Sequence, residues 1–298
     1  MQDQIRRLLT QRNAVLLAHN YQPPEIQALA DLCGDSLELS IRAADTDARV
    51  IVFCGVHFMA ETASILSPDK TVLLPRADAG CPMADMITPQ ALADHLKTVP
   101  PMPVVTYVNS SAAVKALSTI CCTSANAIEV VNSLAEDELL MTPDRNLARN
   151  TARQTTKKIH IWDGCCPFHD RLTVANVAAA RGAHPQALFM AHPECRPEVV
   201  ELADAALSTS GMIRFAAASE ATEFIVGTEV GLLHPLAQQC PGKTFYPASP
   251  RMLCPDMKKI TPRDVLNCLE NLSGEVKVPE EVRRPALSAV TRMIDLAR

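Results

Sequence analysis

The chain has 298 residues, a net charge of −5, 48% hydrophobic and 20% charged residues, which is ordinary for a globular protein. It has no apolar run of ~18 residues, no signal-peptide pattern and no basic cluster, so we expect a cytoplasmic protein without a membrane anchor or a nucleic-acid partner. In such a chain the eleven cysteines indicate reduced thiols, some of them metal ligands, rather than a disulfide framework.

Helices and strands are predicted to alternate along the whole chain. The first third should contain a helix over 4–12, strands over 14–18, 50–53 and 72–74, and a helix beginning near Ser36. The second should contain a helix over 89–97, strands over 104–107, 139–142 and 158–162, and a helix beginning near Ser124. The third should contain a helix over 174–181, strands over 187–191, 223–226 and 244–246, and a helix beginning near Thr209. Two helices, over 262–272 and 280–297, are expected to pack beside the N-terminal helix.

This alternation repeats three times. Cys81-Pro82, Cys166-Pro167 and Cys254-Pro255 each lead, after four variable residues, into Ile-Thr or Leu-Thr. Alternating helices and strands with short connections favour parallel sheets covered on both faces. We therefore predict an α/β fold of three homologous three-layer α/β/α domains around a pseudo-threefold axis. The expected boundaries are 1–85, 86–170 and 171–257, with a C-terminal helical segment over 258–298 packed near the first domain.

The three repeated cysteines are candidate metal ligands. A single thiol beside proline is usually a small buried residue, but three in register would meet at the ligand-binding edge of the sheets. Structural zinc favours four ligands with close C-x2-C pairs, and this spacing is absent here. Three thiolates suit a 4Fe-4S cluster with one open iron, which can act as a Lewis acid in a dehydration. The ligands would be Cys81, Cys166 and Cys254, while Cys165 and the other cysteines are interpreted as core or incidental residues.

Polar side chains also recur at the ends of the first strand of each repeat. They are His19, Tyr21, Tyr107, Asn109, His192 and Glu194. Glu194 is the only carboxylate among them and the best candidate for a general base. The hydroxyls of Ser36, Ser124 and Thr209 are either helix N-caps or, with the helix N-termini, an anion site.

The remaining histidines do not share this register. His95, His160, His169, His184 and His234 are interpreted as structural, and so is His57, although it is also a candidate to line the site.

Taken together, several motifs resemble those of the quinolinate synthase (quinolinate synthetase A) family. They are His19-Asn20-Tyr21-Gln22, Gly34-Asp35-Ser36, Gly55-Val56-His57-Phe58-Met59-Ala60-Glu61, Tyr107-Val108-Asn109-Ser110, His192-Pro193-Glu194-Cys195, Thr209-Ser210-Gly211-Met212 and Cys254-Pro255-Asp256-Met257-Lys258-Lys259-Ile260-Thr261. The resemblance implies an enzyme of NAD biosynthesis that condenses iminoaspartate with dihydroxyacetone phosphate and releases phosphate and two waters. It also implies a 4Fe-4S cluster on Cys81, Cys166 and Cys254.

Matched motif by motif, the resemblance implies two sets of site residues. Substrate binding falls on His19, Ser36, Tyr107, Asn109, Ser124, His192, Glu194 and Thr209. Catalysis is expected of Tyr21, Glu194, His19 and His192, with Tyr21 and Glu194 in proton transfer. An enzyme that oxidises L-aspartate to iminoaspartate is an expected partner. Two alternatives remain open: another 4Fe-4S hydro-lyase of small carboxylic acids, and a non-catalytic metal- or metabolite-binding protein with structural zinc.

Overall fold

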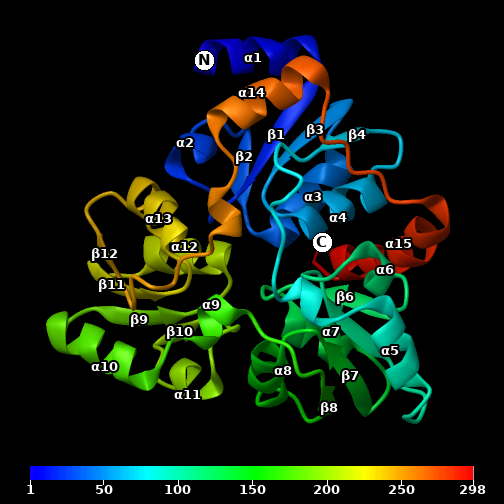
Figure 1. Cartoon of the computed structure of the whole chain (residues 1–298). Helices are drawn as coiled ribbons and strands as arrows, with labels where there is room; N and C mark the ends of the chain where they lie inside the picture. The colour runs from blue at the N-terminus through cyan, green and yellow to red at the C-terminus, as the bar shows by residue number, and fades with distance from the viewer. Residues whose placement is uncertain (298) are drawn as a thin grey trace.

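Three four-stranded parallel sheets form the framework of the computed structural model, which describes residues 1–297. The strand orders are β2-β1-β3-β4, β6-β5-β7-β8 and β10-β9-β11-β12. The strands are β1 (Ala14–His19), β2 (Leu32–Gly34), β3 (Val50–Cys54), β4 (Thr71–Leu73), β5 (Val104–Tyr107), β6 (Ile120–Cys122), β7 (Glu138–Thr142), β8 (Lys158–Ile161), β9 (Leu188–Ala191), β10 (Ala205–Ala206), β11 (Glu223–Gly227) and β12 (Thr244–Pro247). The predicted α/β class with three parallel-sheet domains is confirmed, and Figure 1 shows the three lobes arranged around a common centre.

Helices cover the faces of the sheets. They are α1 (Gln2–Gln11), α2 (Pro24–Gln27), α3 (Ser36–Asp45), α4 (His57–Leu66), α5 (Pro89–Leu96), α6 (Ala112–Lys115), α7 (Ala127–Ser133), α8 (Arg145–Ala152), α9 (Pro167–Asp170), α10 (Val174–Ala183), α11 (Pro197–Val200), α12 (Thr209–Ala218), α13 (Leu233–Gln239), α14 (Pro262–Asn271) and α15 (Glu280–Asp295). Short 3-10 helices span Ala84–Met86, Val230–Leu232 and Asp256–Lys258. None of the helices in residues 1–297 is long and apolar enough to cross a membrane.

The threonine that ends each repeated motif begins a helix. The side chains of Thr88, Thr173 and Thr261 accept hydrogen bonds from backbone N–H groups in the first turns of α5, α10 and α14. Such N-caps satisfy backbone donors that have no partner within the helix. The repeat in the sequence therefore marks the same local structure three times, a Cys-Pro loop followed by a capped helix.

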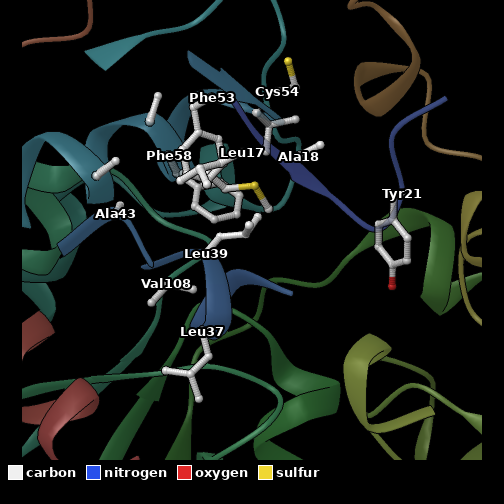
Figure 2. Packing of buried hydrophobic residues seen from close by; sticks show 14 of the residues in the cluster. Leu17, Ala18, Tyr21, Leu37, Leu39, Ala43, Phe53, Cys54, Phe58 and Val108 are labelled. Atoms are coloured by element: carbon white, nitrogen blue, oxygen red, sulfur yellow. The ribbon is translucent and has the colours of Figure 1, made fainter. Parts of the chain in front are cut away.

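Central strands carry continuous apolar runs because both of their faces are buried. In the first unit, Leu17 on β1 and Phe53 on β3 are paired in register and are almost inaccessible to solvent. Figure 2 shows these side chains packed with Leu39 and Phe58, while the Tyr21 ring lies apart from this group. The core thus fixes the strands, and the strand ends project polar residues away from it.

The short edge strands β2, β6 and β10 were not predicted. Each has only two or three residues, which is too short for a period to be visible in the sequence. The helix expected near Ser124 begins later, at Ala127, whereas α3 and α12 begin at Ser36 and Thr209. All four strands of each sheet lie within one of the predicted segments 1–85, 86–170 and 171–257, whose boundaries stay a prediction.

The two C-terminal helices occupy different places. α14 packs against α1, and Gln4 Nε2 on α1 donates a hydrogen bond of 2.8 Å to Glu270 Oε1 on α14. The expectation that α15 lies beside the N-terminal helix is wrong, because α15 packs against β6, α6 and α4 (Figure 1). Its buried stripe includes Val290 and Met293, and Arg292 donates to the Thr119 carbonyl oxygen. This apolar stripe covers the junction of the first and second units.

Candidate functional site

One cavity collects residues from all three units. It is lined by all twelve residues singled out from the sequence, namely His19, Tyr21, Ser36, Cys81, Tyr107, Asn109, Ser124, Cys166, His192, Glu194, Thr209 and Cys254. The parallel strands β1, β5 and β9 end beside it, as expected of ligand sites in such sheets. The structure therefore brings these side chains together, while their individual roles stay predictions.

The three Cys-Pro loops fold alike around their sulfur atoms. Each sulfur accepts hydrogen bonds from backbone N–H groups two or three residues later: Cys81 from Met83 and Ala84, Cys166 from His169, and Cys254 from Asp256 and Met257. These donors favour the thiolate. Burial nevertheless raises the pKa of Cys81 to about 12 and that of Cys254 to about 11. Thiols in such surroundings ionise fully when a bound metal replaces the proton.

Two carboxylates that the sequence did not reveal hold the cysteine loops. Asp144 Oδ2 accepts a hydrogen bond of 3.0 Å from the Cys166 backbone nitrogen, and Glu229 Oε1 accepts one of 3.1 Å from that of Cys254. Asp144 and Glu229 occupy matching places just after β7 and β11. The first unit has Val56 at this place. The carboxylate that holds the cysteine loop is therefore present in the second and third units and absent from the first.

Cys166, rather than the adjacent Cys165, faces the cavity. Cys165 is buried outside it, and its backbone nitrogen lies 3.3 Å from Met86 Sδ. None of the other cysteines, all within residues 1–297, belongs to the cavity lining. The geometry thus separates three candidate ligands from the remaining thiols.

Glu194 lies at the centre of a buried hydrogen-bond network. Tyr107 Oη donates to its Oε1 at 2.6 Å, and His169 Nδ1 lies 2.7 Å from its Oε2. Burial raises the pKa of the Glu194 carboxyl, but the neighbouring His169 and His192 and the donors of His169 and Tyr107 outweigh it and lower the pKa below its usual range. Glu194 is therefore held as a carboxylate with both oxygens occupied.

His169, which is interpreted from the sequence as a structural residue, lines the cavity and continues this network toward Tyr21, while its role stays a prediction. Its Nε2 lies 2.8 Å from Thr228 Oγ1, which lies 2.5 Å from Tyr21 Oη. A continuous hydrogen-bonded chain thus links Glu194, His169, Thr228 and Tyr21. His169 occurs in one repeat only, three residues after Cys166, so comparing the repeats gave no signal for it. His57 lies outside the cavity lining with its side chain 49% exposed.

His19 and His192 are held in the same way in the first and third units. The Nδ1 of His19 accepts from the Tyr21 backbone nitrogen at 3.2 Å, and that of His192 accepts from the Glu194 backbone nitrogen at 3.3 Å. Burial lowers the pKa of each ring to about 3. Both rings are therefore neutral near pH 7 with the proton on Nε2. They can act as hydrogen-bond donors without adding charge.

The three hydroxyls line the cavity without being helix caps. The caps of α3 and α12 are Asp35 and Ser208, so the N-cap interpretation is wrong for Ser36 and Thr209. Ser124 Oγ lies 3.1 Å from His192 Nε2, in the turn before α7. Helix N-termini and hydroxyls are suited to anions. Because no lysine or arginine of residues 1–297 belongs to the lining, an anion in the cavity would be bound by neutral hydrogen-bond donors such as these.

Comparison with known proteins matches the whole chain to one family. The family model described as Quinolinate synthetase A protein matches residues 3–295. The quinolinate synthase of Geobacter sp. (strain M21) is 56% identical over 298 residues, covering 100% of this chain and 98% of that relative. Those of Methanoregula boonei and Thermodesulfovibrio yellowstonii are 54% and 52% identical, covering 99% of this chain and 98% and 97% of the relatives. The chain therefore belongs to the quinolinate synthetase A family.

Proposed function

We propose that this chain is a quinolinate synthase, which condenses iminoaspartate with dihydroxyacetone phosphate to quinolinate and releases phosphate and two waters. The observation that carries the proposal is one cavity, lined by all twelve residues that are expected in the site from the sequence, in a chain matched over its whole length. An enzyme that oxidises L-aspartate is the proposed source of the unstable imine.

Cys81, Cys166 and Cys254 would hold a 4Fe-4S cluster. The fit rests on three buried or half-buried sulfurs on one cavity, each with backbone N–H donors, and on apolar neighbours such as Met83 and Met257. Hydrogen bonds to the sulfurs and solvent exposure are among the features by which proteins set the reduction potential of such clusters. When bound, the cluster supplies one iron without a protein ligand, which is a Lewis acid toward substrate oxygen.

The anionic groups of the substrates would be bound by neutral donors. Ser36 and Thr209 lie in the first turns of α3 and α12, where the helix N-termini favour negative charge. Asn109 lines the same cavity, and its Oδ1 is buried without a hydrogen-bond partner among the described residues. A bound donor, such as a substrate hydroxyl or imine N–H, would satisfy this oxygen.

Ring closure requires protons to leave carbon and nitrogen and to reach departing oxygens. Glu194 is the base in this proposal, because it is the one carboxylate among the polar residues at the ends of β1, β5 and β9, and it is ionised and lines the cavity. The lowered pKa keeps Glu194 ionised and so able to accept a proton, but it also makes the carboxylate a weaker base than one whose pKa lies near the operating pH. His169 and Thr228 offer that proton a hydrogen-bonded route to Tyr21.

An anaerobic assay with both substrates tests this function. The wild-type chain loaded with iron and sulfide should form quinolinate, and the cluster-free chain should not. Turnover of another hydroxy acid without quinolinate formation would favour a different 4Fe-4S hydro-lyase. A colourless protein that contains zinc and has no activity would instead favour the metal-binding alternative.

A further inference from the structure

The loops that follow β1, β5 and β9 each carry polar residues that line the cavity, and buried donors hold carbonyl oxygens in these loops. In the first unit, Gln27 Nε2 donates to the Asn20 and Gln22 carbonyl oxygens at 3.1 and 2.9 Å. In the second, Lys115 Nζ donates to the Ser110 carbonyl oxygen at 2.6 Å. Gln27 and Lys115 both end the short helix after the loop, α2 and α6 respectively. In these two units the side chain that holds the loop belongs to the same unit as the loop.

The third unit lacks this local donor. The matching short helix is α11, and it ends at Val200, whose side chain cannot donate a hydrogen bond. The carbonyls of Pro193, Glu194 and Cys195 are nevertheless held. Their donors come from α8, which belongs to the second unit (Figure 1).

Two asparagines one turn apart on α8 supply these bonds. Asn150 Nδ2 donates to the Pro193 and Cys195 carbonyl oxygens at 2.8 and 2.9 Å, and Asn146 Nδ2 donates to the Glu194 carbonyl oxygen at 3.1 Å. Side chains spaced by four residues share one face of a helix. Both asparagines are buried, and their Oδ1 atoms have no partner among the described residues. Leaving a buried amide oxygen without a hydrogen bond is unfavourable. Because both asparagines bear this cost while their Nδ2 atoms are paired, we interpret the N–H donors as the groups that the site requires.

We infer that Asn146 and Asn150 are positioning residues for Glu194, which fix its carboxylate from the neighbouring unit. The inference rests on the function proposed above. One carboxylate oxygen of Glu194 accepts a hydrogen bond from Tyr107 of the second unit, and the other contacts His169. A shift of the Glu194 backbone would therefore disturb both contacts. Misplacement of a catalytic group by about 1 Å can lower the rate about a hundredfold.

A double-mutant cycle in the cluster-loaded enzyme tests this inference. Asn150→Ala should lower kcat about tenfold or more with little change in KM and with normal iron content. In the Glu194→Gln background the same substitution should change kcat less than about twofold, because residues that act through one group are not additive. The matched control is Gln154→Ala, just beyond the end of α8, whose side chain contacts the Asn150 carbonyl and not the loop. It should leave kcat unchanged.

Hydrogen exchange gives a readout that does not depend on activity. Peptides covering residues 192–196 should exchange faster in Asn150→Ala than in the wild type or Gln154→Ala. An unchanged kcat with a loaded cluster, or an equal loss of kcat in both backgrounds, would overturn the inference. If Asn150→Ala does not fold, Asn150→Ser, which keeps one donor, is measured in the same cycle and by the same criteria. Absence of quinolinate formation by the wild type would instead reject the proposed function.

Discussion

Replacing Glu194 by glutamine removes the proposed base while keeping the size and most of the hydrogen bonds of the side chain. The glutamine oxygen can still accept from Tyr107 Oη, which lies 2.6 Å from the carboxylate. Its amide can donate to His169 Nδ1 once the imidazole proton moves to Nε2 and faces Thr228. The fold should therefore lose only the charge-assisted part of two hydrogen bonds, about 1–3 kcal/mol in total.

The effect on catalysis should be much larger. Loss of a positioned general base lowers the rate about 10²- to 10⁴-fold, which corresponds to about 2.7–5.5 kcal/mol in the activation free energy. The assay measures quinolinate formation under anaerobic conditions, with iron content and the cluster spectrum recorded on the same samples. Glu198→Gln is the matched control, because it neutralises an exposed carboxylate on α11 that does not line the cavity. A near-normal kcat in Glu194→Gln with full cluster occupancy would refute the assignment and move the base to Tyr21 or His192.

Three further predictions concern the ligands, the anion site and stability. Cys166→Ser should lower the iron and sulfide content well below about four each per chain, while Cys165→Ser should not; the reverse pattern would exchange the two assignments. Ser36→Ala should raise KM about tenfold or more without lowering Tm, since Asp35 caps α3, and a lower Tm with an unchanged KM would contradict this. His192 has its pKa lowered to about 3 by burial, so the unfolded chain binds more protons and stability should rise between about pH 3 and about 6.5. His192→Gln should flatten this rise in the free energy of unfolding by up to about 1.4 kcal/mol per pH unit. Thermal melts at pH 5, 6 and 7 in which Tm changes with pH equally in the wild type and in His192→Gln would contradict this prediction.

The repeat predicted the framework of the fold because it marks equivalent loops. Each Cys-Pro-to-Thr segment fixes a loop and a helix cap, so three copies imply three similar units. Residues in register then converge on the centre, which is why the twelve candidates meet in one cavity. The edge strands β2, β6 and β10 and the place of α15 depend on tertiary contacts that a single chain segment does not encode.

Residues that occur in one copy only were not predictable by comparing repeats. His169 connects Glu194 to Thr228, but neither His169 nor Thr228 has an equivalent in the other two units. Asn146 and Asn150 act across the interface between two units, and on α8 they resemble ordinary polar surface residues in sequence. The general position of the site follows from symmetry, whereas the residues of its proposed proton route and of its proposed supports are departures from that symmetry.

Anaerobic turnover with iminoaspartate and dihydroxyacetone phosphate tests the central claim most directly. The cluster-loaded chain should form quinolinate and release one phosphate for each molecule formed, in line with the proposed reaction, and activity should disappear when the cluster is removed. A loaded protein that retains its iron and sulfide yet forms no quinolinate from both substrates would contradict the account.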